Sequence, residues 1–506
     1  MNLPLITLMI LAPLLGALIQ TLNPKISSWV SLFASVASGA IGLFAVAVLS
    51  GHPGQALFRE SLDWLRPFQI SYEVALDGLS APMLVLVSLV FPFVIVSEWR
   101  RTSSRRGVFG LYLLLQSMFV GIVCARDLFF LFSAWAFTAF IFYLLLTLTG
   151  ESKELGKSGE SGTEAAFQYL ITSTMGDALF FCALLLIYFS VEPHSLQLSA
   201  LTSSQLQTDR FEILGRWIAT APTTFFLMVF GLMFRIPIWP VNGWFTRVMS
   251  VGTSSFVVVL CGVFVPLGYY LFLRLGFTIF PAALREASVW FLVLGGLNAV
   301  AGALGAIAQS SLRRMMAYLS LMQGGALLLG ITSFQTAGIV GAVFQLLSIG
   351  LGFAAFGLLV GALLSRGQSD DVTDADGKPV LGGLAARTPL LTAAAALIIG
   401  TMVGVPGLSG FVGQSLIVMG AAQVHPWLMG LFCVVGLLAT IGLVRAFRFL
   451  FLGPERPLTE KWPDLTLRER IFLYPVALAS IFFGLYPKPL MDVVRSSVIE
   501  LLTPGS

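Results

Sequence analysis

Long apolar runs follow one another from the beginning to the end of the chain, with only short polar stretches between them. A run of 18 or more residues can cross a hydrocarbon core of roughly 30 Å as a helix. The alternation typical of a membrane β-barrel is absent, and helices then satisfy every backbone hydrogen bond inside lipid. The pattern predicts about fourteen spans, near 3–22, 27–50, 78–97, 107–125, 128–149, 164–190, 220–248, 252–276, 287–308, 314–333, 336–364, 389–420, 427–452 and 470–494.

Two of these runs contain helix breakers near their middle. Residues 235–240 (RIPIWP) interrupt the run 220–248, and residues 404–410 (GVPGLSG) interrupt the run 389–420. A proline lacks an N–H and clashes with the preceding turn, so each helix is expected to break there. Transporters place such unwound segments at mid-membrane, beside polar cavities. A packing kink is the alternative, because proline and glycine are common in membrane helices.

The two breaks lie five predicted spans apart, which favours two inverted five-helix repeats over a pair of unrelated kinks. We therefore expect an all-α, polytopic membrane protein with broken seventh and twelfth helices. It would form one membrane domain over residues 1–506, with repeats at 107–250 and 287–420 and flanking helices in 1–106 and 421–506.

Composition and charge agree with a membrane protein and set its orientation. Of 506 residues, 57% are hydrophobic and 11% charged, too few polar side chains to coat a water-soluble globule. The loop 98–106 is the densest basic loop, and the positive-inside rule places it in the cytoplasm and both termini outside. The net charge of +4 then reflects topology. We expect a multi-pass protein of a bacterial inner (cytoplasmic) membrane, in contact with lipid and not with nucleic acid.

The sequence gives no sign of a bound cofactor or metal. The four cysteines lie in or at the ends of apolar runs without CxxC spacing, and the histidines fall in loops. Buried cysteines without such spacing are ordinarily small hydrophobic residues. We therefore expect no cofactor and no metal site.

Several motifs together resemble the antiporter-like membrane subunits of respiratory complex I, shared with Mrp-type antiporters and membrane-bound hydrogenases. The likeness covers nearly the whole chain and is nearest to subunit M, although residues 175–177 (MGD) are similar to a subunit L motif. The motifs that carry it are 76–80 (LDGLS), 311–318 (SLRRMMAY), 341–345 (GAVFQ), 382–385 (GGLA), 406–413 (PGLSGFVG), 464–469 (DLTLRE) and 484–489 (GLYPKP).

The resemblance implies a proton path of buried titratable residues. A glutamate in the fifth span pairs with a lysine in the broken seventh, and protons pass a central lysine or histidine in the eighth. They leave by a lysine or glutamate in the broken twelfth. Such a path works because desolvation and neighbouring charges can move the pKa of a buried lysine or glutamate by several units.

This chain departs from that pattern at each of those positions. Residues 127–136 (DLFFLFSAWA) align with the fifth-span motif, and Ala136 takes the place of its glutamate. Arg235 replaces the seventh-span lysine, and Pro266 stands near the position of the central lysine. Two further family histidines are replaced by Ile349 and Gln323, and the twelfth-span glutamate by Gln414. Arginine cannot shuttle protons, because its pKa exceeds about 12.

The remaining polar residues within the predicted spans are the ion-path candidates. They are Asp177, Arg235, Asn242, Asn298, Gln309, Gln345 and Gln414. A carboxylate inside the membrane is a functional candidate by default. We predict that Asp177 pairs with Arg235; the alternative is a carboxylate bonded to hydroxyls such as Ser173 or Thr174.

Three functions remain open at this point. The first is an antiporter-like subunit of a proton-translocating NADH:quinone oxidoreductase, without a redox centre of its own, with a degenerate proton path and with other membrane subunits as partners. The second is the membrane partner of an inorganic-carbon uptake system, which the motif around Asp177 suits. The third is a cation/proton antiporter subunit, which would need more carboxylates than Asp177 alone.

Overall fold

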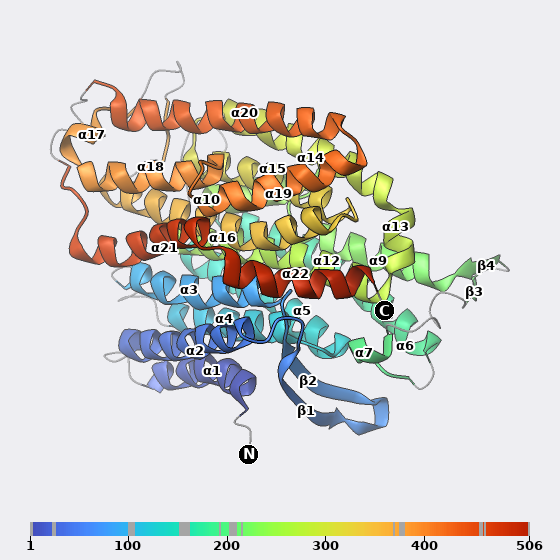
Figure 1. Cartoon of the computed structure of the whole chain (residues 1–506). Helices are drawn as coiled ribbons and strands as arrows, with labels where there is room; N and C mark the ends of the chain where they lie inside the picture. The colour runs from blue at the N-terminus through green and yellow to red at the C-terminus, as the bar shows by residue number, and fades with distance from the viewer. Residues whose placement is uncertain are drawn as a thin grey trace.

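The helices of the chain run side by side as one bundle, with small hairpins beyond one end (Figure 1). The structure, a computed structural model, describes residues 4–22, 27–99, 107–150, 162–191, 194–201, 210–213, 216–367, 370–373, 380–454, 459 and 462–503. The basic loop residues 100–106 and the acidic stretch 374–379 lie outside the described residues, as do the lysines within 151–161.

The elements of the first half are α1 (Leu5–Leu22), α2 (Ser27–Ser50), β1 (Leu57–Leu65), β2 (Ile70–Leu76), α3 (Ala81–Glu98), α4 (Val108–Cys124), α5 (Leu128–Thr149), α6 (Gly162–Ser190), α7 (Leu198–Leu201), β3 (Arg210–Ile213), β4 (Arg216–Ala219), α9 (Thr220–Met233) and α10 (Gly243–Val251). The long helices of the first half follow the predicted ranges, while β1 to β4 and α7 lie between them.

The second half continues in the same way. Its elements are α11 (Ser254–Val259), α12 (Val265–Ile279), α13 (Pro281–Glu286), α14 (Ser288–Ala308), α15 (Leu312–Ile331), α16 (Thr336–Gly367), α17 (Leu384–Arg387), α18 (Pro389–Val403), α19 (Ser409–Val424), α20 (Trp427–Phe447), α21 (Leu467–Leu485) and α22 (Lys488–Leu502). Single π-helical segments join α11 to α12 (Leu260–Phe264) and extend α20 (Arg448–Leu452).

Both predicted breaks are confirmed. The seventh range consists of α9 and α10, separated by residues 234–242, and the twelfth consists of α18 and α19, separated by residues 404–408. Gly404 and Gly407 have φ angles of 83° and 90°, a region that favours glycine because a Cβ would be strained there. The inverted repeat itself stays a prediction.

Eight of the described helices are both long and apolar enough to cross a membrane, and α21 with α22 makes a ninth if that bent pair is one span. The other predicted ranges contain helices that are shorter, broken or less apolar. Each of the fourteen ranges holds a helix or a pair of helices, while the number of spans stays a prediction.

The last predicted range is not one straight helix. The range 470–494 holds two helices, because α21 and α22 meet at an angle of 69° and α22 continues to Leu502. The bend lies at residues 486–489 (YPKP), where two prolines prevent the helix from continuing.

Two short antiparallel hairpins, β1–β2 and β3–β4, are the part of the fold that the sequence does not predict. The connection that contains β1–β2 also meets both ends of the chain. The backbone N–H groups of Ile6 and Thr7 donate to the Glu60 carboxylate, and Ser497 Oγ accepts from the N–H of Gly78. The beginning of α1 and the end of α22 therefore lie at the same end of the bundle.

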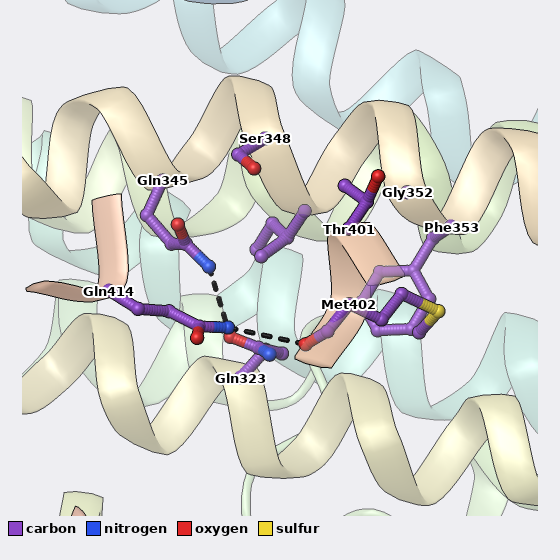
Figure 2. A pocket seen from close by; sticks show the side chains of 9 residues that line it. Gln323, Gln345, Ser348, Gly352, Phe353, Thr401, Met402 and Gln414 are labelled. Atoms are coloured by element: carbon purple, nitrogen blue, oxygen red, sulfur yellow. Dashed lines mark hydrogen bonds between the residues drawn. The ribbon is translucent and has the colours of Figure 1, made fainter. Parts of the chain in front are cut away.

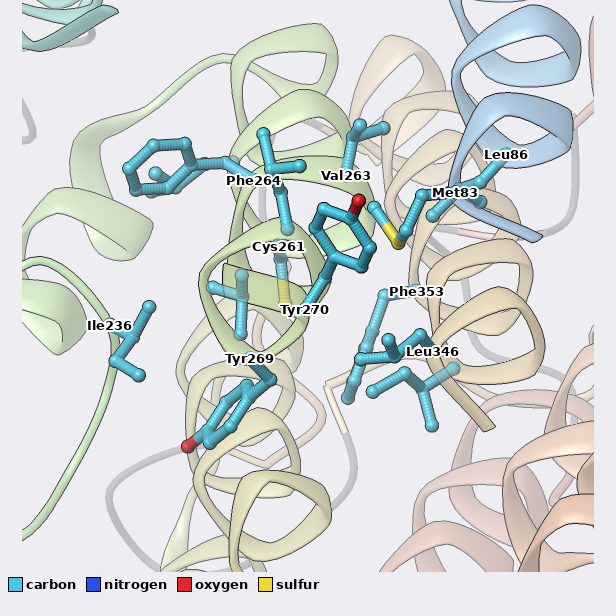
Figure 3. Packing of buried hydrophobic residues seen from close by; sticks show 14 of the residues in the cluster. Met83, Leu86, Ile236, Cys261, Val263, Phe264, Tyr269, Tyr270, Leu346 and Phe353 are labelled. Carbon is cyan, nitrogen blue, oxygen red and sulfur yellow. The ribbon is translucent and has the colours of Figure 1, made fainter. Parts of the chain in front are cut away.

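The centre of the bundle is formed by the α11–α12 helix and α16. All of the apolar window of Ser254–Ile279 is buried, and 94% of that of Thr336–Gly367. Figure 3 shows side chains of this core, with Phe264, Tyr269 and Tyr270 on the α11–α12 helix and Leu346 and Phe353 on α16. These two helices are surrounded by protein, while the flanking helices carry exposed apolar side chains.

Candidate functional site

The first break carries Arg235, whose side chain is fully buried. Its Nη1 donates to Asp177 Oδ1 at 3.0 Å and to the carbonyl oxygen of Trp135 at 2.7 Å. Its Nη2 donates to Thr138 Oγ1 at 2.8 Å. The guanidinium carbon also lies 4.4 Å from the ring centre of Trp135 and 5.1 Å from that of Phe264. The predicted pair of Asp177 and Arg235 is therefore present.

Two glycines bring the paired residues together. A Cβ on Gly176 would lie 2.5 Å from the carbonyl oxygen of Gly231, and a Cβ on Gly231 would lie 2.7 Å from that of Gly176. Only glycine fits at both positions, so α6 and α9 approach closely along this face. Asp177 follows Gly176 directly, and Arg235 follows the end of α9 by two residues.

The acidic partner of Arg235 lies on α6, whereas the family pattern places it on the fifth span, which is α5 here. The side chain of Ala136 on α5 has no hydrogen-bond acceptor. Its neighbour Trp135 contributes a backbone carbonyl oxygen to Arg235. Arginine cannot act as a proton shuttle. Asp177 lies within hydrogen-bonding distance of this fixed positive charge, and the pair ties α6 to the first break.

The second break borders a small cavity of about 10 Å³ (Figure 2). Gln345 Nε2 donates to Gln323 Oε1 at 3.3 Å, and Gln414 Nε2 donates to the carbonyl oxygen of Met402 at 3.3 Å. Ile349, at one of the replaced family positions, lines the same cavity. The space is about one water molecule in size. Gln323, Ile349 and Gln414 line it at positions where the family pattern has titratable groups, whereas Gln345 matches the family motif.

Four hydroxyl groups beside this cavity form a continuous hydrogen-bonded chain. Ser409 Oγ lies 2.9 Å from Ser348 Oγ and 2.9 Å from Ser480 Oγ, and Ser480 Oγ lies 2.8 Å from Thr401 Oγ1. Thr401 in turn donates to the carbonyl oxygen of Leu397. The chain ties together α16, α19, α21 and α18 and holds the second break against the core.

The other ion-path candidates either bond to the backbone or lie outside the two clusters described above. Asn298 Oδ1 accepts from the N–H of Trp239 at 2.7 Å and so fixes the first break. Gln309 donates to the carbonyl of Gly305 at the end of α14, and Asn242 sits at the N-terminus of α10 without a side-chain cap. Pro266 is buried just after the π-helical turn. No hydrogen bond between described side chains joins the Arg235 cluster to the glutamine cluster. The role of these residues in an ion path stays a prediction.

A third polar cluster lies at the end of the bundle that carries the β1–β2 hairpin, and sequence reasoning missed it. Asp77 Oδ2 accepts from Arg274 at 2.6 Å and from Arg126 at 2.9 Å. The sequence did contain one indication of this cluster, because Arg274 is a charged residue within the predicted apolar range 252–276. Burial alone would raise the pKa of Asp77, but the two guanidiniums outweigh it and hold that pKa well below its usual range.

The Asp77 cluster predicts a specific pH dependence. Its folded-state pKa lies below the unfolded value of about 3.9, so its stabilisation is present above that value and is lost as the pH falls through the folded value. We expect Asp77→Asn to lower the melting temperature at neutral pH and the difference from the native chain to shrink below about pH 4. Melting curves from pH 7 to pH 3 measure this, and a difference independent of pH would contradict it.

The described residues contain no group of three or more histidine, cysteine, aspartate or glutamate side chains that could hold a metal ion. The chemistry available at the two breaks is therefore that of a fixed ion pair and of neutral hydrogen-bonding groups.

Comparison with known proteins assigns the chain to a family. Residues 125–440 match the family described as NADH:quinone oxidoreductase/Mrp antiporter, TM. The chain is 26% identical to NADH-quinone oxidoreductase subunit M of Rhodobacter capsulatus, over 94% of this chain and 90% of that protein.

Solved structures share the fold over nearly the whole chain. One is a chain of respiratory complex I from Thermus thermophilus with bound NADH (22% identity, TM-score 0.83, 98% of this chain and all of that one). Another is a chain of the Mrp complex from Dietzia sp. DQ12-45-1b (20% identity, TM-score 0.86, 100% of this chain and 98% of that one).

Proposed function

Because the chain belongs to the NADH:quinone oxidoreductase/Mrp antiporter family of membrane subunits, we propose that it is an antiporter-like subunit of a proton-translocating NADH:quinone oxidoreductase-type complex. Its partners are the other membrane subunits of that complex, and it has no redox centre of its own. It resides in a bacterial inner membrane with both termini on the outer side. The name of the subunit M relative supports this assignment.

We further propose that its own proton path is degenerate. The observation that carries this is the Arg235–Asp177 pair, in which the permanently charged arginine occupies the position where the family places a lysine. At the second break, Gln323, Ile349 and Gln414 line the cavity at positions where the family pattern has two histidines and a glutamate, and none of the three side chains titrates. The chain then keeps the scaffold of a pump and serves as a structural or altered coupling element.

Affinity purification from native membranes tests the assignment. We expect the tagged chain to bring down several other membrane subunits together with flavin and iron–sulfur subunits, and the preparation to reduce quinone with a nicotinamide donor. Purification with a soluble zinc protein alone would favour the inorganic-carbon uptake system instead. Purification without any partner would contradict the proposal.

A further inference from the structure

Two arginines at the end of α20 have no carboxylate partner among the described residues. Arg445 is half-buried and Arg448 is exposed. Arg445 Nη2 donates to the carbonyl oxygen of Gln309 at 3.5 Å, and its guanidinium carbon lies 6.0 Å from the ring centre of Phe449. Its Nε is buried and makes no hydrogen bond to a described residue. The guanidinium of Arg448 makes no hydrogen bond or ion pair within the described part of the chain.

The elements that pack against α20 carry no acidic side chain. α20 packs against α14, α15, α18 and α19, and it continues into the π-helical segment Arg448–Leu452. None of these described elements contains an aspartate or a glutamate. The short helix α17, which lies against the π-helical segment, ends at a further arginine, Arg387. These neighbours therefore offer Arg445 and Arg448 no counter-charge.

The surface that leads to the two arginines is apolar. Figure 1 shows α20 at the edge of the bundle, with α14 beside it. A Cβ on Gly442 would lie 3.4 Å from Ile307 Cγ1, so α20 packs against α14 one turn before Arg445. Ile441 and Val444 are exposed. They share one face of α20 with the arginines, because residues three and four positions apart are neighbours on a helix surface.

The spacing along α20 places the arginines at the level of lipid headgroups. Trp427 at the beginning of α20 is 65% exposed, and Trp290 near the beginning of α14 is 74% exposed. Tryptophan is enriched at the interface between membrane and water. The 18 residues from Trp427 to Arg445 rise about 27 Å, close to the roughly 30 Å of a hydrocarbon core. The arginines therefore lie at the opposite interface.

We propose that the surface formed by Ile441, Val444, Arg445 and Arg448, here named the arginine face, binds one anionic phospholipid. The guanidiniums of Arg445 and Arg448 donate to the headgroup phosphate, and the acyl chains lie along the apolar side chains of α20 toward Trp427. In the proposed orientation this lipid belongs to the cytoplasmic leaflet, and only that assignment of the leaflet rests on the proposed function.

The chemistry of the arginine face favours an anionic lipid over a zwitterionic one. A guanidinium binds phosphate through two parallel hydrogen bonds and stays charged, and basic sites between transmembrane helices bind anionic headgroups. A choline headgroup brings its own cation, which repels the two arginines, whereas a glycerol headgroup does not. Gln309 and Phe449 hold Arg445 in place before the lipid binds, which lowers the entropic cost of binding.

Native mass spectrometry of the full chain in detergent tests the proposal. Phosphatidylglycerol and phosphatidylcholine with the same acyl chains are added in equal amounts, and we expect the native chain to retain phosphatidylglycerol with a severalfold preference. Arg445→Gln with Arg448→Gln is expected to abolish that preference. Equal retention of the two lipids by the native chain, or an unchanged preference in this double variant, would overturn the proposal.

The matched control removes the same charge at the end of the bundle that carries the β1–β2 hairpin. Arg66→Gln with Arg285→Gln changes two exposed arginines there. We expect this variant to keep the preference of the native chain. A control that loses the preference as the Arg445 and Arg448 variant does would show a general effect of net charge, and would contradict a site at the arginine face.

A photoreactive lipid tests the same surface in the assembled complex without any substitution. Phosphatidylglycerol with a diazirine next to its headgroup is expected to label residues 441–452 severalfold more than the matching phosphatidylcholine. Equal labelling by the two lipids, or no label on this segment because another subunit covers it, would overturn the proposal. Either result leaves the proposed function intact, because that function is tested by the partners that co-purify.

Discussion

Replacing Asp177 with leucine is expected to destabilise the chain by about 3–5 kcal/mol, because the change leaves a fully buried guanidinium without its counter-charge. The hydrogen bonds from Arg235 to the Trp135 carbonyl and to Thr138 remain, but neither partner carries a charge. Unfolding of the purified chain in detergent, followed by circular dichroism or intrinsic fluorescence, measures the loss.

The double variant Asp177→Leu with Arg235→Leu is the matched control. Removing both charges together exchanges a buried ion pair for apolar packing, which is often neutral for stability. We expect it to recover most of the stability that the single variant loses. A single variant as stable as the native chain, or a double variant as unstable as the single one, would show that the pair does not hold the first break in place.

Replacing Asp370 with alanine is the second change with a large expected effect. Arg313 and Asp370 are both fully buried, with Nε and Oδ2 at 3.2 Å. The same carboxylate accepts from Ser311 Oγ at 2.6 Å, and Arg313 also donates to the carbonyl of Gly252 at 2.8 Å. Removal of the carboxylate takes away its charge pairing and its hydrogen bonds with a fully buried arginine, which is expected to cost about 3–5 kcal/mol.

Asp63→Ala is the comparison for that experiment. Asp63 faces Arg66 at 3.7 Å on the surface of the β1–β2 hairpin, with 69% of its side chain exposed. An exposed pair of this kind contributes about 0–1 kcal/mol. Denaturant unfolding of both variants in parallel gives the two losses, and equal losses would contradict the structural role of the Arg313–Asp370 pair.

The sequence predicted the features that depend on local pattern. The broken helices follow from proline and glycine at 237, 240, 404, 406 and 407, whose backbone preferences act within one turn. The pairing of Asp177 with Arg235 followed because two opposite charges in an otherwise apolar protein have few other partners.

What the sequence did not predict depends on contacts between distant segments. The hydroxyl chain joins Ser348 to Thr401 across four helices, and serine within an apolar helix ordinarily bonds to its own backbone, so nothing local indicates it. The acceptors on Trp135 and Thr138 were equally hidden, because a backbone carbonyl is present at every residue and a threonine hydroxyl within a helix ordinarily bonds to its own backbone. The Arg313–Asp370 pair joins a family motif to the connection after α16, and 57 residues separate its two members, so no local pattern indicates it.

Proton flux into sealed vesicles that contain only the purified chain is the most direct test of the central claim, that this scaffold has lost its titratable path. An imposed membrane potential drives the flux, a pH-sensitive dye inside the vesicles reports it, and a protonophore added at the end confirms that the vesicles are sealed. With Arg235 permanently charged and Gln345 and Gln414 unable to titrate, we predict the same rate as in protein-free vesicles. A flux well above that rate, produced by this chain without any other subunit, would contradict the account.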